Sequence, residues 1–82
     1  MTLPPDFTLL RDALRRRLEI IADTAWRDRD SASQLQALQE ISESIFHQHA
    51  ALSAKLPPRL RHFMDSQSYA KALAMLDEMA AG

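Results

Sequence analysis

Apolar residues in the middle of the chain recur with the period of a long helix. Between Ser31 and Leu56 they fall at steps of three, four or seven, which places them along one side of a helix. These positions are Leu35, Leu38, Ile41, Ile45, Leu52 and Leu56. A capping box formed by Ser31 and Gln34, or Asp30 as the cap one residue earlier, can start this helix. The double proline that follows Leu56 is expected to end it, because proline lacks a backbone donor and disfavours helical dihedrals in the preceding residue.

A second amphipathic pattern runs from about Asp6 to about Trp26 and predicts the first helix. Its apolar stripe comprises Phe7, Leu10, Leu14, Leu18, Ile21 and Ala25, and it is broadened by Leu9, Ala13, Ile20 and Ala22. The opposite face is charged, with acidic and basic residues three or four positions apart that can form surface ion pairs. The connector over residues 27–30 is short and polar. Such a connector between two long helices predicts an antiparallel hairpin.

Two shorter helices are predicted after the double proline. Pro58 suits the first turn of a short helix, whose apolar positions are Leu60, Phe63 and Met64. A polar stretch over residues 65–68, where Ser66 or Ser68 can act as a cap, leads to the last helix, predicted over about 67–80. The apolar face of that helix is Tyr69, Ala72, Leu73, Leu76, Met79 and Ala80, with Met75 at its margin.

Together these patterns predict one all-α domain over residues 1–82. We expect a small helical bundle in which a long antiparallel helical hairpin is followed by one short and one medium helix. The composition agrees, because 46% apolar residues is typical of a globular chain and a single glycine disfavours the tight turns of an all-β fold. The absence of cysteine excludes disulfides and Cys-ligated zinc.

Charge and hydropathy narrow the classes of partner. The formal net charge is −1, with ten basic and eleven acidic residues interspersed, so there is no overall field to attract nucleic acid or an anionic membrane. No apolar run approaches the ~20 residues needed to cross a bilayer. The first residues lack the charged start and apolar centre of a signal peptide. We therefore expect a cytoplasmic protein with no membrane partner.

Candidate catalytic and metal-binding residues are few. His47 and His49 lie two positions apart and point to different sides of a helix, so they cannot form a helical two-histidine metal pair. Glu40, Glu43 and His47 share a helix face. The spacing from Glu43 to His47 is one residue longer than the Glu-x-x-His pattern of di-iron bundles, however, and the chain has no second copy of it. There is also no nucleophile–base–acid set and no glycine-rich phosphate loop. We expect no enzyme activity, no cofactor and no metal.

Three polar or aromatic residues have two interpretations each. Ser42 and His49 are polar positions in line with the apolar stripe of the central helix. His49 is either a half-buried histidine bonded to a backbone or serine partner, or, with Ser42, a polar layer that fixes the register of a helical interface. Trp26, beside the connector, either packs against the end of the hairpin or serves as an exposed anchor for a partner.

A surplus of apolar positions predicts a protein–protein interaction module. Phe46 widens the apolar face of the central helix, and methionine side chains in the last helix suit adaptable interfaces. A homodimer that completes a larger bundle is the partner we expect. The candidate interface residues are Trp26, Ser42, Phe46, His49, Met75 and Met79.

Two basic clusters support an alternative, a small nucleic-acid-binding regulatory protein. Arg15–Arg17 have acidic neighbours at helical spacing, so surface ion pairs explain them as well. Arg59, Arg61 and His62 form a candidate patch for an anion or an acidic partner, although a solvated helix start would look the same. Neither cluster has the interleaved aromatic residues of a nucleic-acid site, so we favour a protein partner over nucleic acid.

Overall fold

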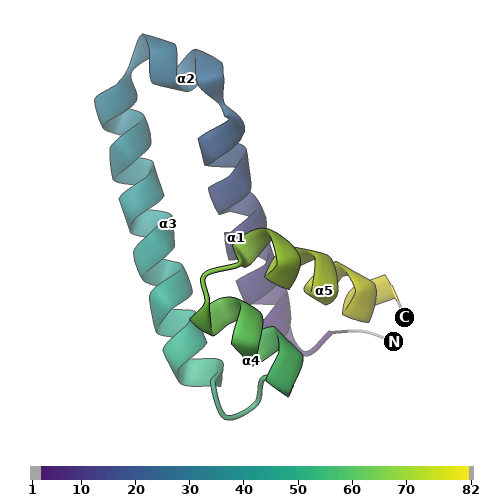
Figure 1. Cartoon of the computed structure of the whole chain (residues 1–82). Coiled ribbons are helices and arrows are strands. Elements are labelled where there is room, and N and C mark those ends of the chain that lie inside the picture. Colours follow the sequence, from purple (N-terminus) through teal and green to yellow (C-terminus); the bar gives the residue numbers. More distant parts are fainter. Residues whose placement is uncertain (1–2, 82) are drawn as a thin grey trace.

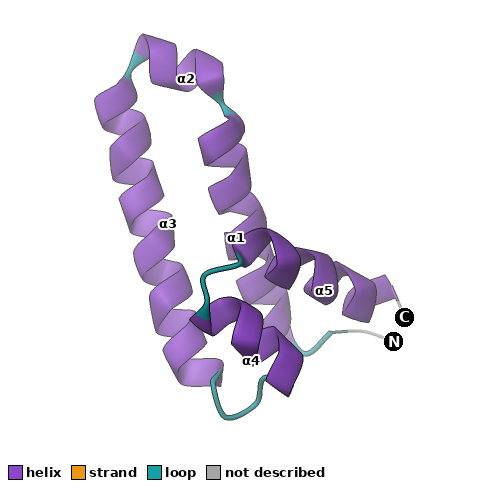
Figure 2. Cartoon of the chain, viewed as in Figure 1, coloured by secondary structure: helices purple, strands orange, loops and turns teal. Residues whose placement is uncertain are grey.

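The computed structural model describes residues 3–81, which form helices and contain no strand (Figure 2). The helices are α1 (Pro5–Ala22), α2 (Thr24–Arg29), α3 (Ser31–Leu52), α4 (Pro58–Asp65) and α5 (Tyr69–Ala81). None of these helices combines the length and apolarity needed to cross a membrane. α1 and α3 run side by side in opposite directions with α2 across one end, and α4 and α5 lie over the other end (Figure 1). The all-α prediction of a long antiparallel hairpin followed by a short and a medium helix is confirmed.

Two aspartates divide the region that joins the long helices. Asp23 leaves helical dihedrals, with φ −81° and ψ 82°, and its Oδ1 accepts the Trp26 backbone N–H at 2.9 Å, which caps α2. Asp30 caps α3 in the same way, because its Oδ1 accepts the Ser33 N–H at 3.1 Å. Aspartate competes for backbone donors, so the helix breaks here without glycine or proline. The prediction of one helix to Trp26 is therefore wrong, since α1 ends at Ala22.

Gln34 joins α3 to α1 instead of completing a capping box. The residue is 9% exposed, and its Nε2 donates to the carbonyl oxygens of Ile20 at 2.6 Å and Asp23 at 3.1 Å. The Ile20 carbonyl lies in the last turn of α1, and the Asp23 carbonyl lies at the C-cap of that helix. Asp30, and not Ser31, caps α3. The first turn of α3 is thus attached to the last turn of α1.

α3 ends before the double proline. It stops at Leu52, and the N–H groups of Lys55 and Leu56 both donate to the Leu52 carbonyl, at 2.8 and 3.1 Å, in a tightened final turn. Leu56 remains buried although it lies outside the helix. Pro58 occupies the first turn of α4, as predicted.

The turn between α4 and α5 depends on Gln67, which adopts a left-handed conformation with φ 59°. Its N–H donates to the Met64 carbonyl at 3.1 Å, and the Ser68 N–H donates to the Phe63 carbonyl at 2.8 Å. This pair of hydrogen bonds is the Schellman motif, which satisfies the last carbonyls of a helix. Because the chain reverses at Gln67, α5 begins at Tyr69 and not at the predicted position 67.

The main core lies at the end of the hairpin that α4 and α5 cover. It is formed by Leu3, Phe7, Leu10, Ala13, Leu14, Ile45, Leu52, Leu56, Leu60, Met64, Ala72, Leu73 and Leu76. Ile20 is also buried but lies outside this cluster. The apolar stripes predicted for the two long helices are buried only at the end of the hairpin that α4 and α5 cover. Ile21, Ala25 and Leu35 are exposed, because neither α4 nor α5 extends over their end of the hairpin (Figure 1).

Polar contacts fix α5 against α1. Arg15 Nη2 lies 2.7 Å from Asp77 Oδ1, and Arg11 Nε lies 3.9 Å from the same oxygen. The Arg17 guanidinium lies over the Tyr69 ring, 4.9 Å from its centroid. These partly exposed contacts contribute more to the orientation of α5 than to stability, since solvent screens such pairs.

Candidate functional site

An apolar groove lies between α1 and α3 at the end that carries α2. This hairpin groove has a volume of about 590 Å³ and is lined by Ile20, Ile21, Arg27, Ser31, Ala32, Gln34, Leu35 and Leu38. Ile21 is 44% exposed and Leu35 is 55% exposed. The groove exists because α1 and α3 form a two-helix layer there, without a third helix above it (Figure 1). A cluster of accessible large apolar side chains of this kind is typical of an interaction surface.

Charges of both signs lie at the closed end of the hairpin, where Arg27 also lines the hairpin groove. The segment that closes this end of the hairpin holds Asp23, Asp28 and Asp30 together with Arg27 and Arg29. Each of these residues is exposed. Such a mixed border neither attracts nor repels a strongly charged partner, and it can face a copy of itself without net repulsion.

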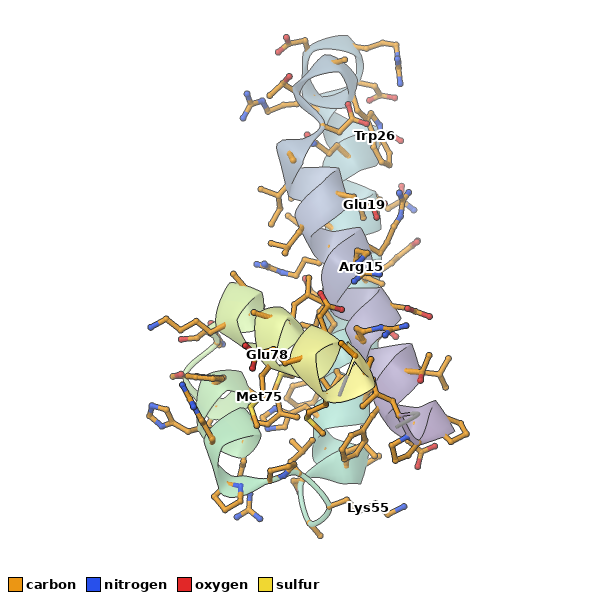
Figure 3. All side chains as sticks on the ribbon, turned by 90° about the vertical axis from the view of Figure 1, so that its right-hand side faces the viewer. Arg15, Glu19, Trp26, Lys55, Met75 and Glu78 are labelled. Atoms are coloured by element: carbon orange, nitrogen blue, oxygen red, sulfur yellow. The ribbon has the colours of Figure 1, made fainter. Side chains whose placement is uncertain are left out.

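A second groove lies between α4 and α5. This α4–α5 groove has a volume of about 630 Å³ and is lined by Arg59, His62, Phe63, Lys71, Ala74, Met75, Glu78 and Met79. Its apolar part consists of Phe63, Met75 and Met79, which are half-buried and pack against the main core. Met75 and Glu78 lie on the side of α5 that faces α4 (Figure 3).

Basic side chains border the α4–α5 groove. The Arg59 guanidinium lies over the Phe63 ring, 5.6 Å from its centroid, which holds this charge beside the apolar surface. Lys71 lines the groove from the α5 side. Among residues 3–81, no carboxylate lies within ion-pairing distance of Arg59, Arg61 or Lys71. Both arginines and the lysine are therefore available to an external anionic group.

The structure brings together two sets of candidate residues that the sequence kept apart. Arg59 and His62, from the predicted anion or partner patch, line the same groove as Met75 and Met79, from the predicted interface. Arg61 is exposed but does not line the groove. Lys71 was not identified from the sequence, because a single lysine on a helix gives no signal until the neighbouring helix is placed.

The remaining interface candidates lie elsewhere. Trp26 lies in α2, half-buried at the end of the hairpin (Figure 3). Ser42 is half-buried on α3, whereas Phe46 is 68% exposed. None of these residues lines the hairpin groove. The groove residues Ile21 and Leu35 belong to the predicted core stripes, since periodicity alone does not show where a covering helix ends.

His49 contacts α4 within the same chain. Its Nε2 lies 3.0 Å from Asp65 Oδ1, and its side chain is 23% exposed. It is thus a half-buried histidine, but its partner is a carboxylate and not the backbone or serine group expected from the sequence. This contact joins the C-terminal half of α3 to the end of α4.

The Arg15–Arg17 cluster is engaged in contacts within the chain. Arg15 pairs with Asp77, and Arg17 stacks on Tyr69. Arg16 Nη1 lies 3.7 Å from Glu19 Oε2. These contacts leave no set of three free guanidinium groups on α1 for phosphates.

Within the described part of the chain, no three His, Asp or Glu side chains converge to a point that could hold a metal ion. Glu40, Glu43 and His47, the set considered from the sequence, are all exposed on α3.

The two grooves differ in chemical character. The hairpin groove is apolar with a border of mixed charge, whereas the α4–α5 groove has an apolar floor and a largely basic border. Only the α4–α5 groove borders the main core, against which its residues Phe63, Met75 and Met79 pack. No family model, no curated protein and no solved structure matches this chain, so its function is inferred from these two surfaces.

Proposed function

We propose that this protein is a small helical interaction protein that associates with a second copy of itself through the hairpin groove. The observation that carries the proposal is the accessible apolar lining of that groove, above all the exposure of Ile21 and Leu35. Because Ile21 and Leu35 are already about half covered, each gains about half of the ~1.5–3 kcal/mol that burial of a fully exposed side chain provides.

The character of the groove supports a second copy as the partner. A two-fold dimer places the same patch of each subunit against the other, so the patch must be complementary to itself. The hairpin groove meets this condition, because Leu35 lines it and is 55% exposed, so this side chain can contact the groove of the partner. The mixed charges of residues 23–30 avoid the repulsion that a border of one sign would cause between identical copies.

The test is the oligomeric state and its dependence on two side chains. Sedimentation velocity between about 10 µM and about 1 mM should show a monomer–dimer equilibrium, since a small apolar interface gives affinities in this range. Leu35→Gln and Ile21→Gln should each weaken the dimer by about tenfold or more, because each buries a polar amide at the centre of the contact.

Leu9→Gln is the matched control. Leu9 is 61% exposed and lies at the opposite end of α1, in a depression shared with Gln48 and Ala51. This variant should dimerise as the parent does. A chain that stays monomeric throughout the concentration range, or a dimer that Leu9→Gln weakens as much as Leu35→Gln does, would refute the proposal.

A further inference from the structure

The α4–α5 groove has the shape and chemistry of a receptor for a helix. Two packed helices form its walls, and Phe63, Met75 and Met79 provide a half-buried apolar floor. Methionine adapts its shape to different apolar side chains, which suits a surface that receives a separate element. α4 has 8 residues, and the lining residues of α5 run from Lys71 to Met79, so each wall extends for about 12 Å and the groove can contact about two turns of a partner helix. An amphipathic helix binds such a groove with apolar residues at i, i+3, i+4 and i+7.

The charges at the border of the groove indicate which residues should flank the apolar stripe of the bound helix. Arg59 and Lys71 lie on opposite walls, and neither has a carboxylate partner among residues 3–81. Stacking on Phe63 holds the Arg59 guanidinium at the edge of the floor, where it remains accessible. From this complementarity we propose that the α4–α5 groove binds an amphipathic helix of another protein whose apolar stripe is flanked by aspartate or glutamate.

Glu78 gives the bound helix a direction. It lies seven residues after Lys71 on α5, which is about 10 Å along the helix axis. Along the α5 wall the border of the groove therefore changes sign. On that wall an acidic residue of the partner lies beside Lys71 and a neutral or basic residue lies beside Glu78, whereas on the α4 wall Arg59 attracts an acidic residue.

A protein helix fits these features better than a nucleic acid does. Phosphate groups would gain from Arg59 and Lys71, but they would face Glu78 and leave the apolar floor without a partner. The inference is independent of the proposed dimer, because the two grooves share no lining residue and lie on different helices.

The experiment is a titration of the whole protein with a helical peptide. Binding is monitored through the NMR chemical shifts of the backbone amides and the methionine methyl groups. The probe is a blocked helical peptide of about 15 residues with a leucine stripe flanked by glutamates. Two further peptides have lysines in place of the glutamates, or the same composition with the stripe scrambled. The acidic peptide should shift the signals of Phe63, Met75 and Met79 and should bind at least about tenfold more tightly than either of the others.

Charge-reversal variants localise the binding. Arg59→Glu and Lys71→Glu should each weaken the acidic peptide several-fold, because each replaces an attraction at the border with a repulsion. Arg29→Glu makes the same change in net charge on α2, away from the groove, and should leave the affinity unchanged. Met79→Gln should also weaken the binding, because it makes the apolar floor more polar without changing the charge of the border. An unchanged pattern of dispersed NMR signals would show that this variant is folded.

Several results would overturn the inference. They are equal binding of the lysine or scrambled peptide, no binding of the acidic peptide, and shifts confined to the hairpin groove. Tighter binding of duplex DNA to the same residues at the same salt concentration would identify a nucleic-acid site instead. Shifts of Met75 and Met79 that grow with the concentration of the protein alone would show that a second copy occupies this groove.

Discussion

Gln34 provides the sharpest test of how the hairpin is held together. Its side-chain amide is buried and donates to the carbonyls of Ile20 and Asp23, so it joins the first turn of α3 to the end of α1. We predict that Gln34→Ala lowers the free energy of unfolding by about 2 kcal/mol. Two hydrogen bonds at about 1 kcal/mol each account for most of this loss, and the buried methylene that alanine lacks adds less than 1 kcal/mol.

The backbone limits the size of this effect. The Ile20 carbonyl also accepts the Asp23 N–H at 3.3 Å, and the Asp23 carbonyl accepts the Arg27 N–H at 3.2 Å. Neither carbonyl is therefore left without a donor when Gln34 is removed, and the larger penalty for an orphaned buried acceptor does not apply. Alanine also has a slightly higher helix propensity than glutamine, which reduces the predicted loss of stability by a few tenths of a kcal/mol.

Gln34→Glu tests the effect of losing the amide hydrogen-bond donor while the volume of the side chain stays nearly the same. The two side chains have nearly the same shape, but an ionised carboxylate would direct an oxygen at two carbonyl oxygens. We predict a loss of about 3 kcal/mol at neutral pH. Burial and the facing carbonyls raise the pKa of the introduced carboxyl above its ordinary value of about 4.3. The protonated form can donate one hydrogen bond, so the deficit relative to the parent is small in acid and grows as the pH rises through the raised pKa.

Urea unfolding followed by circular dichroism measures both variants against the parent at each pH. Gln36→Ala on the exposed face of α3 is the control and should change stability by less than about 0.5 kcal/mol. If Gln34→Ala costs no more than this control, or if the deficit of Gln34→Glu does not depend on pH, the side chain does not hold the two helix ends as described.

Two further predictions concern the turn after α4 and the main core. Gln67→Gly should raise the stability by about 0.5–1 kcal/mol, because glycine removes the steric cost of the left-handed conformation; a lower midpoint in thermal unfolding would show that the glutamine side chain makes a stabilising contact instead. Leu76→Ala should cost about 2–5 kcal/mol, because Leu76 is fully buried in α5. Leu9→Ala at an exposed position should cost less than about 0.5 kcal/mol, and similar losses for the two in urea unfolding would mean that α5 does not pack as observed.

The periodic apolar pattern was sufficient to predict α1, α3, α4 and α5 and their order, but not the separate helix α2. It failed where a single polar side chain decides the outcome. Asp23 interrupts a pattern that continues smoothly to Trp26, and it does so by a hydrogen bond that competes with the helix. Gln34 appeared to be part of a local capping box because its true partners, on α1, are 11 and 14 residues away.

The candidate site was harder to predict for a related reason. Ile21 and Leu35 have the same spacing as the buried residues of their helices, and only the position of α4 and α5 leaves them exposed. The α4–α5 groove depends on the reversal at Gln67, which brings Arg59 next to Met75 and Met79. The polar stretch over residues 65–68 indicates a break between the two helices, but it does not indicate a left-handed residue, since that position is usually occupied by glycine.

The unequal coverage of the hairpin has a consequence for how the molecule moves. At the end that carries α2, buried apolar surface is limited to Ile20 and its immediate neighbours, whereas the other end contains nearly the whole core. Segments with few buried contacts open locally at a small fraction of the free energy of global unfolding. The last turn of α1, α2 and the first turn of α3 can therefore rearrange while the rest of the chain stays folded, so a partner at that end would meet a surface able to adjust to it.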